Sequence, residues 1–481
     1  MIKITPQEIS SIVSQLVIQA NRYLPTGLVH ALGHARERET SKTGKFILDI
    51  LIDNASIAAQ TGLPVCQDTG IDVVFVEIGQ DVSIPGDIEQ AVAQGIEQGT
   101  ASGLLRSSVC DPLTRHNTGN NTPPVVHTEL TRESGIKIAV LPKGCGSENM
   151  SAMKMLPPSA GTKGIISAVV EQVRAAGPNP CPPGVIGVGI GGTMEKAALI
   201  AKKALLRPIG QRHHREDVAE IERTIEQRLE QTGIGPMGLG GRTTTLAVHA
   251  EVYPCHIASL IVAINIQCHA ARYATAQLQD GKWAISDFHD TQAQSQHRPP
   301  MPVTPHRLSL PLDGDTTSRL RAGDWVLLTG TLFTGRDQTH RKLVELLRSG
   351  NSLPVDLRNQ LIYYVGPSPA PQGRAIGSAG PTTSYRMDAY TPEILEQGVL
   401  ALMGKGKRSE SVRQALKDHG AIYLATIGGA GAFLSDCIKG CTVAAFPELG
   451  PEALFRMEVE DFPAVVINDC QGNDLYGQPK L

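Results

Sequence analysis

Apolar residues near the start of the chain recur at the spacing of one helical face. Thr5 and Glu8 match a capping box, and Pro6 stands at the first helical position. The apolar face that follows consists of Ile9, Ile12, Val13, Leu16 and Val17. The pattern predicts an amphipathic helix that begins after Thr5 and packs its apolar face on a core.

The last third of the chain alternates between short apolar runs and stretches with helical spacing. Runs at 325–335, 361–369 and 399–406 are typical of buried strands. The segments at 337–350 and 409–420 have helical spacing and follow the first and last of these runs. This alternation predicts an α/β fold, mixed α+β over the whole chain.

A polar, Pro-rich stretch at 286–306 shows neither a helical nor a strand period. We interpret it as a linker between an N-terminal domain at 1–285 and a C-terminal domain at 307–481. A chain of 481 residues is long enough for two or three cores, so the N-terminal domain is expected to contain two lobes.

A glycine-rich stretch at 184–206 has the spacing of a dinucleotide-binding fingerprint. Gly187, Gly189 and Gly192 follow an apolar run and precede a helical pattern. The acidic residue that the fingerprint needs about 20 positions later is absent, because that segment is basic as far as Glu216. The alternatives are a tight strand-to-helix turn or a helix N-terminus that faces an anion.

Composition narrows the class of partner. The net charge is −3 with no basic block, and aromatic residues make up 4%, so we expect neither nucleic-acid binding nor attachment to a membrane surface. No apolar run reaches the length of a membrane span, and the start of the chain lacks a signal-peptide core. Nine widely spaced cysteines predict a reducing compartment, hence a cytoplasmic protein without disulfides.

Three of the cysteines stand in settings that suit a metal cluster: Cys66 in "PVCQDTG", Cys181 in "NPCPPGVIG" and Cys268 in "NIQCHAARYA". No CxxC pair is present, so a ribbon-type zinc site is not expected. Spacing alone makes each thiol a core residue more readily than a ligand. Cys437 and Cys441, four residues apart, could bind metal from a helix but lack partner ligands, so we assign them to the core.

Cationic residues fall at positions that suit an anion site. Arg336 follows a predicted strand, and Arg106, Arg386 and Lys405 stand in glycine- or hydroxyl-rich turns. Cations that converge at strand ends would suit a dicarboxylate, whereas scattered ones would be ordinary surface charge. The adjacent Thr382 and Thr383 would otherwise cap a helix.

The sequence resembles the class I fumarate hydratase family, which also includes L-tartrate dehydratase and mesaconase. The resemblance rests on motifs that run in family order from about residue 5 to about residue 475: "PVCQDTG", "KGCGSENMSAMK", "PCPPGVIGVGIGG", "QCHAAR", "GRDQTH", "IGSAGPTTSYRMD", "GKGKRS" and "GGAGAF" with the "FPELGPEALFRMEVEDFPAVVINDCQGND" stretch. It implies a bilobed N-terminal cluster-binding domain, a swivelling-type C-terminal domain and a homodimer.

The resemblance also implies the chemistry. Cys66, Cys181 and Cys268 would hold a 4Fe–4S cluster with one iron open as a Lewis acid. Asp68 would protonate the departing hydroxyl of malate, and Thr382 would take the carbon-bound proton. The two carboxylates of the substrate would be bound by Gln67, Arg106, Gly146, Arg336, Thr383, Arg386 and Lys405. Cys145 departs from the family pattern, which often has Gly or Ala there, and places a fourth thiol near the site.

Reversible hydration of fumarate to (S)-malate is the reaction that the resemblance favours, because "GKGKRS" is similar to fumarases. L-Tartrate and then mesaconate are the alternatives within the family. Outside it, a dinucleotide-binding oxidoreductase would rest on the glycine-rich stretch alone. A non-catalytic dicarboxylate-binding protein would be favoured by loss of a cluster cysteine, and all three are present.

Overall fold

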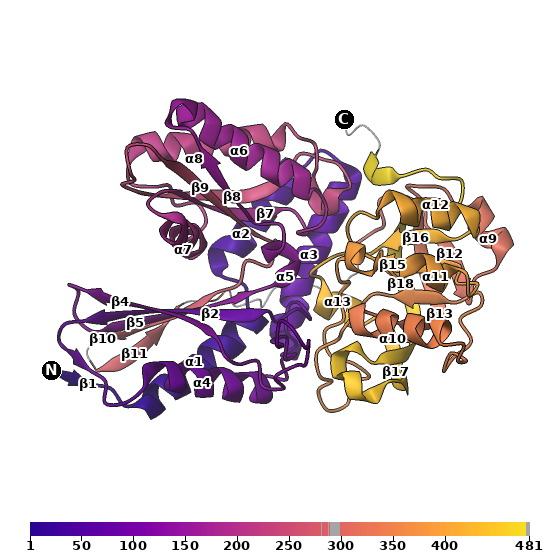
Figure 1. Cartoon of the computed structure of the whole chain (residues 1–481), viewed down its shortest axis with the longest axis horizontal. Coiled ribbons are helices and arrows are strands. Elements are labelled where there is room, and N and C mark those ends of the chain that lie inside the picture. The colour runs from indigo at the N-terminus through magenta and orange to yellow at the C-terminus, as the bar shows by residue number, and fades with distance from the viewer. Residues whose placement is uncertain (280, 287, 289–298, 478–481) are drawn as a thin grey trace.

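The chain forms three lobes that meet at its centre (Figure 1). The structure is a computed structural model that describes residues 1–279, 281–286, 288 and 299–477. Two lobes belong to the N-terminal part of the chain and the third to the C-terminal part. None of the helices in the described ranges is long and apolar enough to cross a membrane. The predicted mixed α/β class is confirmed by this architecture.

The first lobe is a sheet with two long helices on one face. Strand order is β11-β10-β5-β2-β4, and a short parallel pair joins β1 to β3. The strands are β1 (Ile2–Lys3), β2 (Ile71–Gly79), β3 (Val82–Ser83), β4 (Val125–Thr131), β5 (Ile136–Lys143), β10 (Ala274–Gln279) and β11 (Lys282–Ile285). Helices α1 (Pro6–Arg22) and α4 (Ile88–Ser102) cover it. The predicted capping box of Thr5 and Glu8 is present, and the predicted apolar face of α1 is buried.

The second lobe has helices on both faces of its sheet. Strand order is β6-β9-β7-β8, with strands β6 (Ala152–Leu156), β7 (Gly184–Gly191), β8 (Thr245–Tyr253) and β9 (Leu260–Gln267). Helices α6 (Gly161–Ala176) and α8 (Glu216–Glu230) pack on one face, and α7 (Met194–Ala204) packs on the other. Side chains at Gly187 and Gly189 would collide with the carbonyls of Ala201 and Ala197, so these glycines let α7 approach the strand. The structure thus favours the strand-to-helix turn over the nucleotide fingerprint.

The third lobe is a sheet that curls back on itself. Strand order is β12-β13-β14-β15-β16-β18-β17, and β18 also pairs with β13. The strands are β12 (His306–Leu310), β13 (Trp325–Thr334), β14 (Leu361–Tyr363), β15 (Ala401–Gly404), β16 (Ile422–Ala425), β17 (Ile438–Ala445) and β18 (Leu454–Asn468). Its helices are α9 (Gly314–Arg319), α10 (Asp337–Arg348), α11 (Thr391–Leu395), α12 (Glu410–Asp418) and α13 (Gly431–Ser435).

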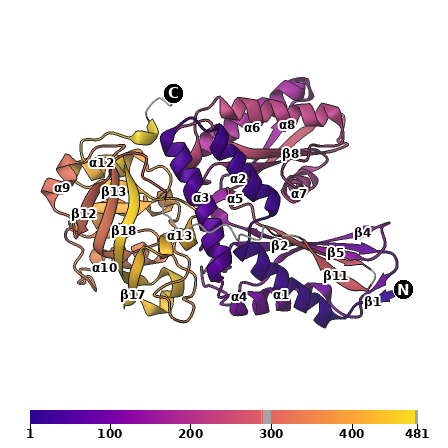
Figure 2. The same ribbon diagram turned by 180° about the vertical axis from the view of Figure 1, so that it is seen from behind.

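Helices α2 (Thr26–Arg38) and α3 (Lys42–Thr61) lie between the lobes (Figures 1 and 2). Phe46 of α3 packs edge to face on Trp325 of β13, with ring centroids 5.1 Å apart. Both rings belong to one apolar core that continues from α2 and α3 into the third lobe. The N-terminal and C-terminal parts of the chain therefore share a core.

Most of the elements predicted in the third lobe are confirmed. Strand β13 is followed by α10, and β15 is followed by α12, as the pattern predicts. The predicted strand at 361–369 is shorter, because only Leu361–Tyr363 pairs with its neighbours. Cys437 is buried as predicted, and Cys441 is partly buried against the same core. Cys441 lies in β17, which pairs with β18, so the two cysteines do not share a helix. Of the predicted linker, residues 287 and 289–298 lie outside the described residues.

A buried carboxylate joins α2 and α3 to the second lobe. Glu39 is 1% exposed, and its oxygens accept hydrogen bonds from the backbone N–H groups of Thr40, Ser41, Arg242 and Thr243 at 2.9–3.1 Å. Burial by itself would raise the pKa of Glu39, but these bonds lower it overall.

We predict that Glu39→Gln lowers the free energy of unfolding by about 2 kcal/mol, because an amide N–H would face backbone N–H donors. The bonds contribute fully above the unfolded pKa of about 4.3 and are lost as the pH falls through the lower folded value. The difference from wild type in urea unfolding should therefore narrow below that pH. Glu37→Gln, at an exposed position on α2, is the control. Equal stability of Glu39→Gln and wild type at neutral pH would contradict the assignment.

Candidate active site

The three candidate ligand thiols come from loops that meet at the centre of the molecule. Cys66 lies between α3 and β2, Cys181 lies between α6 and β7, and Cys268 follows β9. Cys66 and Cys181 are buried, and Cys268 is partly buried. Cys268 interacts electrostatically with both of the other thiols. Residues separated by up to about two hundred positions are thus brought to one place.

Burial controls the charge of these thiols. It raises the pKa of Cys66 to about 11, although the guanidinium of Arg272 acts in the opposite direction. It also raises the pKa of Cys181, against the nearby ammonium of Lys405. Without a bound metal the two buried thiols are therefore protonated at neutral pH.

Asp68 follows Cys66 by two positions and is surrounded by cations. Its carboxylate accepts hydrogen bonds from Nη2 of Arg106 at 2.9 Å and from the backbone N–H of Cys145 at 3.1 Å. Burial would raise the pKa of Asp68, but Arg106, Arg272 and further cations lower it overall. Asp68 is therefore a charged carboxylate in the site.

Two arginines from different parts of the chain lie close together beside Asp68. Arg106 donates to the carbonyl of Gly366 at 2.8 Å, and a side chain at Gly366 would meet the guanidinium of Arg336. Burial and the like charge of Arg336 lower the pKa of Arg106 to about 10. Arg336 pairs with Glu452 at 3.2 Å, and this carboxylate helps to raise its pKa against the effect of burial. Both cations therefore stay charged in a small volume.

Thr382 is held by a cation rather than used as a helix cap. Nη2 of Arg386 donates to Oγ1 of Thr382 at 2.7 Å. The short 3-10 turn Ser384–Met387 begins after Thr383 and has no side-chain cap. Because Arg386 donates, the hydrogen of the Thr382 hydroxyl remains available to another acceptor. The alternative of an ordinary threonine cap is therefore not observed.

Lys405 reaches across from the third lobe. Its Nζ lies 2.7 Å from Sγ of Cys181 and 3.3 Å from the carbonyl of Asn179. A β-carbon at Gly146, in the short helix α5 (Cys145–Glu148), would lie 2.9 Å from that Nζ and 3.3 Å from Oγ1 of Thr383. Gly146 therefore lets the N-terminal part of the chain approach the cation and the threonine.

Gln67 joins the thiol loop to the threonine loop. It is 2% exposed, and its Nε2 donates to the carbonyl of Pro381 at 3.3 Å. Its Oε1 accepts from the thiol of Cys66 at 3.3 Å. The geometry therefore brings together the thiols, the two candidate proton carriers and the residues expected to bind carboxylates.

Several polar atoms in this region have no hydrogen-bond partner within the described part of the chain. They are Nε of Arg336, Nε of Arg386, Oγ1 of Thr383, Oε1 of Gln267, and Nε and Nη1 of Arg272. Oε1 of Gln267 can only accept a hydrogen bond, and the others can donate. Buried polar groups are usually paired, so the predominance of donors indicates a place for an anionic ligand.

Two residues of the site were not singled out from the sequence. His269 is buried, its ring lies 2.8 Å from the carbonyl of Gly428, and burial lowers its pKa to about 4. Arg272 is 2% exposed and donates to the carbonyl of Asp68 at 2.6 Å. Both lie in the "QCHAAR" motif that contains Cys268. This position beside a candidate ligand was the sequence signal that could have identified them.

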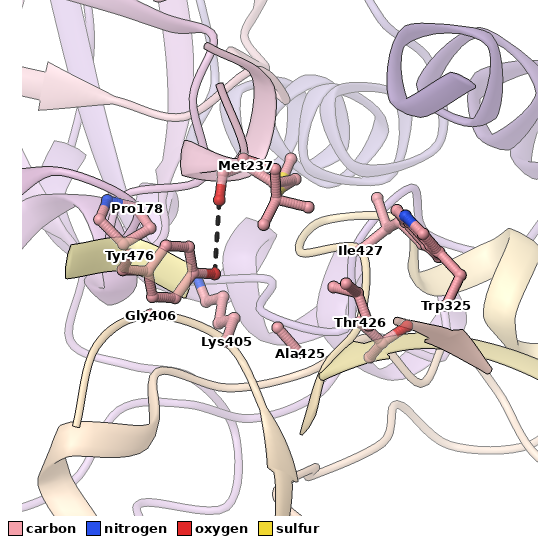
Figure 3. Close-up of a pocket in the computed structure, with 11 residues that line it drawn as sticks. Pro178, Met237, Trp325, Lys405, Gly406, Ala425, Thr426, Ile427 and Tyr476 are labelled. Carbon is pink, nitrogen blue, oxygen red and sulfur yellow. Dashed lines mark hydrogen bonds between the residues drawn. The ribbon is translucent and has the colours of Figure 1, made fainter. Parts of the chain in front are cut away.

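Two hollows border the site. Figure 3 shows Lys405 beside one lined by Pro178 and Met237 from the N-terminal part and by Trp325 and Tyr476 from the C-terminal part. Its volume of about 10 Å³ suits a single water and is too small for a dicarboxylate. A cleft of about 810 Å³ between the two parts of the chain is lined by Arg106. Among the described residues, no three His, Cys, Asp or Glu side chains converge closely enough to hold a metal ion.

Two family models match nearly the whole chain. The model described as fumarate hydratase matches residues 10–277, and the model described as fumarase C-terminus matches residues 285–479. The aerobic class I fumarate hydratase of Escherichia coli K12 is 31% identical over 100% of this chain and 92% of its own length. Fumarate hydratase 2 of Leishmania major is 32% identical over 92% of this chain and 81% of its own.

A protein of Methanocaldococcus jannaschii named "Putative L(+)-tartrate dehydratase subunit alpha" is 42% identical over 56% of this chain and 98% of its own length. The matches extend over both the thiol-bearing lobes and the third lobe, which carries Thr382, Arg386 and Lys405. On the two models and the full-length relatives, the chain belongs to the class I fumarate hydratase family.

Proposed function

We propose that this protein is a hydro-lyase that adds water to fumarate to form (S)-malate, and catalyses the reverse reaction. The observation that carries the proposal is the convergence of Arg106, Arg272, Arg336 and Lys405 on a carboxylate, Asp68, beside three thiols. Relatives that match over the full length are named fumarate hydratases.

The thiols fit an iron–sulfur cluster better than a single ion. Soft thiolates are the ligands of such clusters, and Cys66, Cys181 and Cys268 would each bind a different iron. Close convergence on one point is then not required, in keeping with the lack of a single-ion site among the described residues. The unpartnered N–H groups of Arg272 and the ammonium of Lys405 offer positive charge to the thiolates. When bound, the cluster would supply a Lewis acid beside the substrate.

Asp68 and Thr382 are the two proposed proton carriers. During hydration the charged carboxylate of Asp68 would accept a proton from water, and in the reverse reaction the carboxylic acid so formed would return that proton to the hydroxyl that leaves malate. Thr382 would take the carbon-bound proton of malate. The guanidinium of Arg386 at 2.7 Å favours the charged form of that hydroxyl, which an isolated threonine does not reach near neutral pH.

The cations would bind the two carboxylates of the substrate. Bidentate arginines match carboxylate geometry, and Arg336 and Arg386 each keep an unpartnered Nε among the described residues. Thr383, Gln67 and the close approach at Gly146 would complete the binding set. Negative charge that develops on a carboxylate during proton removal would be stabilised by the same donors.

Other expectations remain proposals. Division into domains at 1–285 and 307–481 is supported by the M. jannaschii subunit, whose length corresponds to about half of this chain. A homodimer, a swivelling-type third lobe and a cytoplasmic location remain predictions. Cys145 contributes a backbone N–H to Asp68, and no role follows for its thiol.

L-Tartrate is the second candidate substrate, because the subunit named for tartrate dehydratase has the higher identity of 42%. We expect anaerobically purified protein to turn over fumarate faster than L-tartrate or mesaconate when the three are assayed side by side. Faster turnover of L-tartrate would transfer the assignment to that substrate. Inactivity toward all three, with iron present, would contradict the proposed function.

Replacing a ligand thiol should remove iron and activity together. We predict this for Cys66→Ser, Cys181→Ser and Cys268→Ser, because each lost thiolate leaves one iron without its protein ligand. The measurement is the content of iron and sulfide per chain, together with the visible colour of the protein. Cys110→Ser and Cys470→Ser are controls outside the thiol group and should keep both. Full iron content in Cys181→Ser would show that the ligand assignment is wrong.

Replacing either proton carrier should lower turnover without loss of the cluster. Asp68→Asn and Thr382→Val should each lower kcat about 10²–10⁴-fold with iron content unchanged. Thr382→Val should also abolish exchange of the C3 proton of malate in deuterated water, whereas Asp68→Asn is expected to keep part of it.

Thr317→Val is the matched control for the hydroxyl. Thr317 is 1% exposed, and it donates to the carbonyl of Gly420 at 2.9 Å in the third lobe. This variant should lose stability and keep turnover. If Thr382→Val behaves in the same way, with kcat within about threefold of wild type, Thr382 is not the base.

A further inference from the structure

Arg272 connects two of the thiol-bearing loops. It follows Cys268 by four positions in the chain. Its Nη2 donates to the carbonyl of Asp68 at 2.6 Å, and Asp68 itself follows Cys66 by two positions. The residue is 2% exposed and is among the largest fully buried side chains. A permanent positive charge is thus fixed in the interior between these loops.

The rest of this guanidinium has no partner among the described residues. Nε and Nη1 are buried without a hydrogen bond. Asp72 interacts with Arg272 electrostatically, but its carboxylate bonds to Nδ2 of Asn121 at 3.0 Å instead. No ion pair between Arg272 and a carboxylate is found in the described residues. The carboxylate of Asp68 interacts with Arg272 electrostatically, but its direct ion pair is with Arg106. A buried cation without a direct ion pair is costly, so the unpartnered N–H groups of Arg272 favour a further anionic partner.

The thiol of Cys66 is an anion-forming group that interacts with this cation. The bond from Arg272 to the carbonyl of Asp68 holds the guanidinium against the loop that also carries Cys66, and the two side chains interact electrostatically. Three thiolates at Cys66, Cys181 and Cys268 would bring three negative charges into a buried volume. Lys405 contacts Cys181 directly, whereas its interaction with Cys66 is electrostatic and not a hydrogen bond.

We propose that Arg272 is a positioning residue that compensates the charge of the thiolate-bound cluster and donates its unpartnered N–H groups toward the sulfur at Cys66. The inference rests on the cluster site of the proposed function. Charge and N–H bonds to sulfur set the potential and the retention of iron–sulfur clusters. Arg272 therefore controls how firmly the cluster is held and how readily it accepts an electron, without touching the substrate.

The test uses the anaerobically purified holoenzyme. We predict that Arg272→Gln releases iron to a chelator about tenfold faster than wild type. Its cluster should also be harder to reduce, with a more negative potential in a dithionite titration followed by electron paramagnetic resonance. Arg272→Lys keeps the positive charge but loses the planar set of N–H donors of the guanidinium. It should therefore keep a cluster reduction potential close to that of wild type and release iron faster than wild type.

Arg207→Gln is the matched control for loss of a buried ion pair. Arg207 pairs with the fully buried Glu222 and with Glu251 in the second lobe. This variant should lower the thermal unfolding midpoint and leave the iron release rate and the potential unchanged. Wild-type values of both quantities in Arg272→Gln would overturn the inference. If Arg272→Gln does not fold, iron release from Arg272→Lys decides: a faster rate supports the inference, and an unchanged rate overturns it.

The variant Asp72→Asn tests the competing explanation that Arg272 only balances the negative charge of Asp72. If the double variant with Arg272→Gln regains the wild-type potential and iron release rate, the inference is overturned. If it behaves like Arg272→Gln, the inference is supported. Wild-type protein that holds no iron after anaerobic purification would instead contradict the proposed function, and this inference with it.

Discussion

The arrangement of the site depends on one contact, in which a glycine loop of the third lobe lies directly on the thiol loops. Side chains at Gly428 and Gly429 would collide with Sγ of Cys181 and with the ring of His269. Asn54 of α3 donates to the carbonyl of Gly429 at 3.3 Å and accepts from the N–H of Phe433 at 2.9 Å. Since backbone packs on side chain here, the loop fixes the position of the third lobe to within a van der Waals contact, and Lys405 of that lobe then reaches the thiol of Cys181.

That contact gathers charge that the site must balance before any substrate arrives. Arg336 pairs with Glu452, Arg386 pairs with Asp337 at 3.3 Å, and Arg106 pairs with Asp68. Arg336 and Arg386 each keep an unpartnered Nε among the described residues, so these two cations are held in place without being saturated, whereas every nitrogen of Arg106 is used. Pre-positioned donors cost little reorganisation when a dianion binds, which is why such an arrangement suits both binding and stabilisation of developing charge.

Local sequence signals were sufficient to predict several helices and strands, whereas other features depend on contacts that the local pattern does not show. The capping box at Thr5 and the succession of β13 and α10 depend on neighbours in the chain, so pattern was sufficient. Parallel strands β13 and β15 place Arg336 and Lys405 at one sheet edge, which strand-end reasoning anticipated. The spacing of Cys437 and Cys441 also suits a helix, and pairing with the next strand, β18, places Cys441 in a strand. The motifs, rather than spacing, identified the thiols, because gaps of this length carry no geometric information.

Burial alone does not distinguish a structural arginine from a functional one. Arg408 has no exposed side-chain area, and its nitrogens bond to Asp388, Tyr364 and Thr391 while the guanidinium lies 5.1 Å from the ring centre of Tyr423. All of its donors are used inside the protein, so its role ends with holding the third lobe together. Arg272 is buried to a similar degree and uses one donor group, on a carbonyl that carries no full charge. Folding free energy does not favour such an arrangement by itself. Under the proposed role of Arg272, the thiolates of a bound cluster would supply the negative charge that this guanidinium lacks in a direct ion pair.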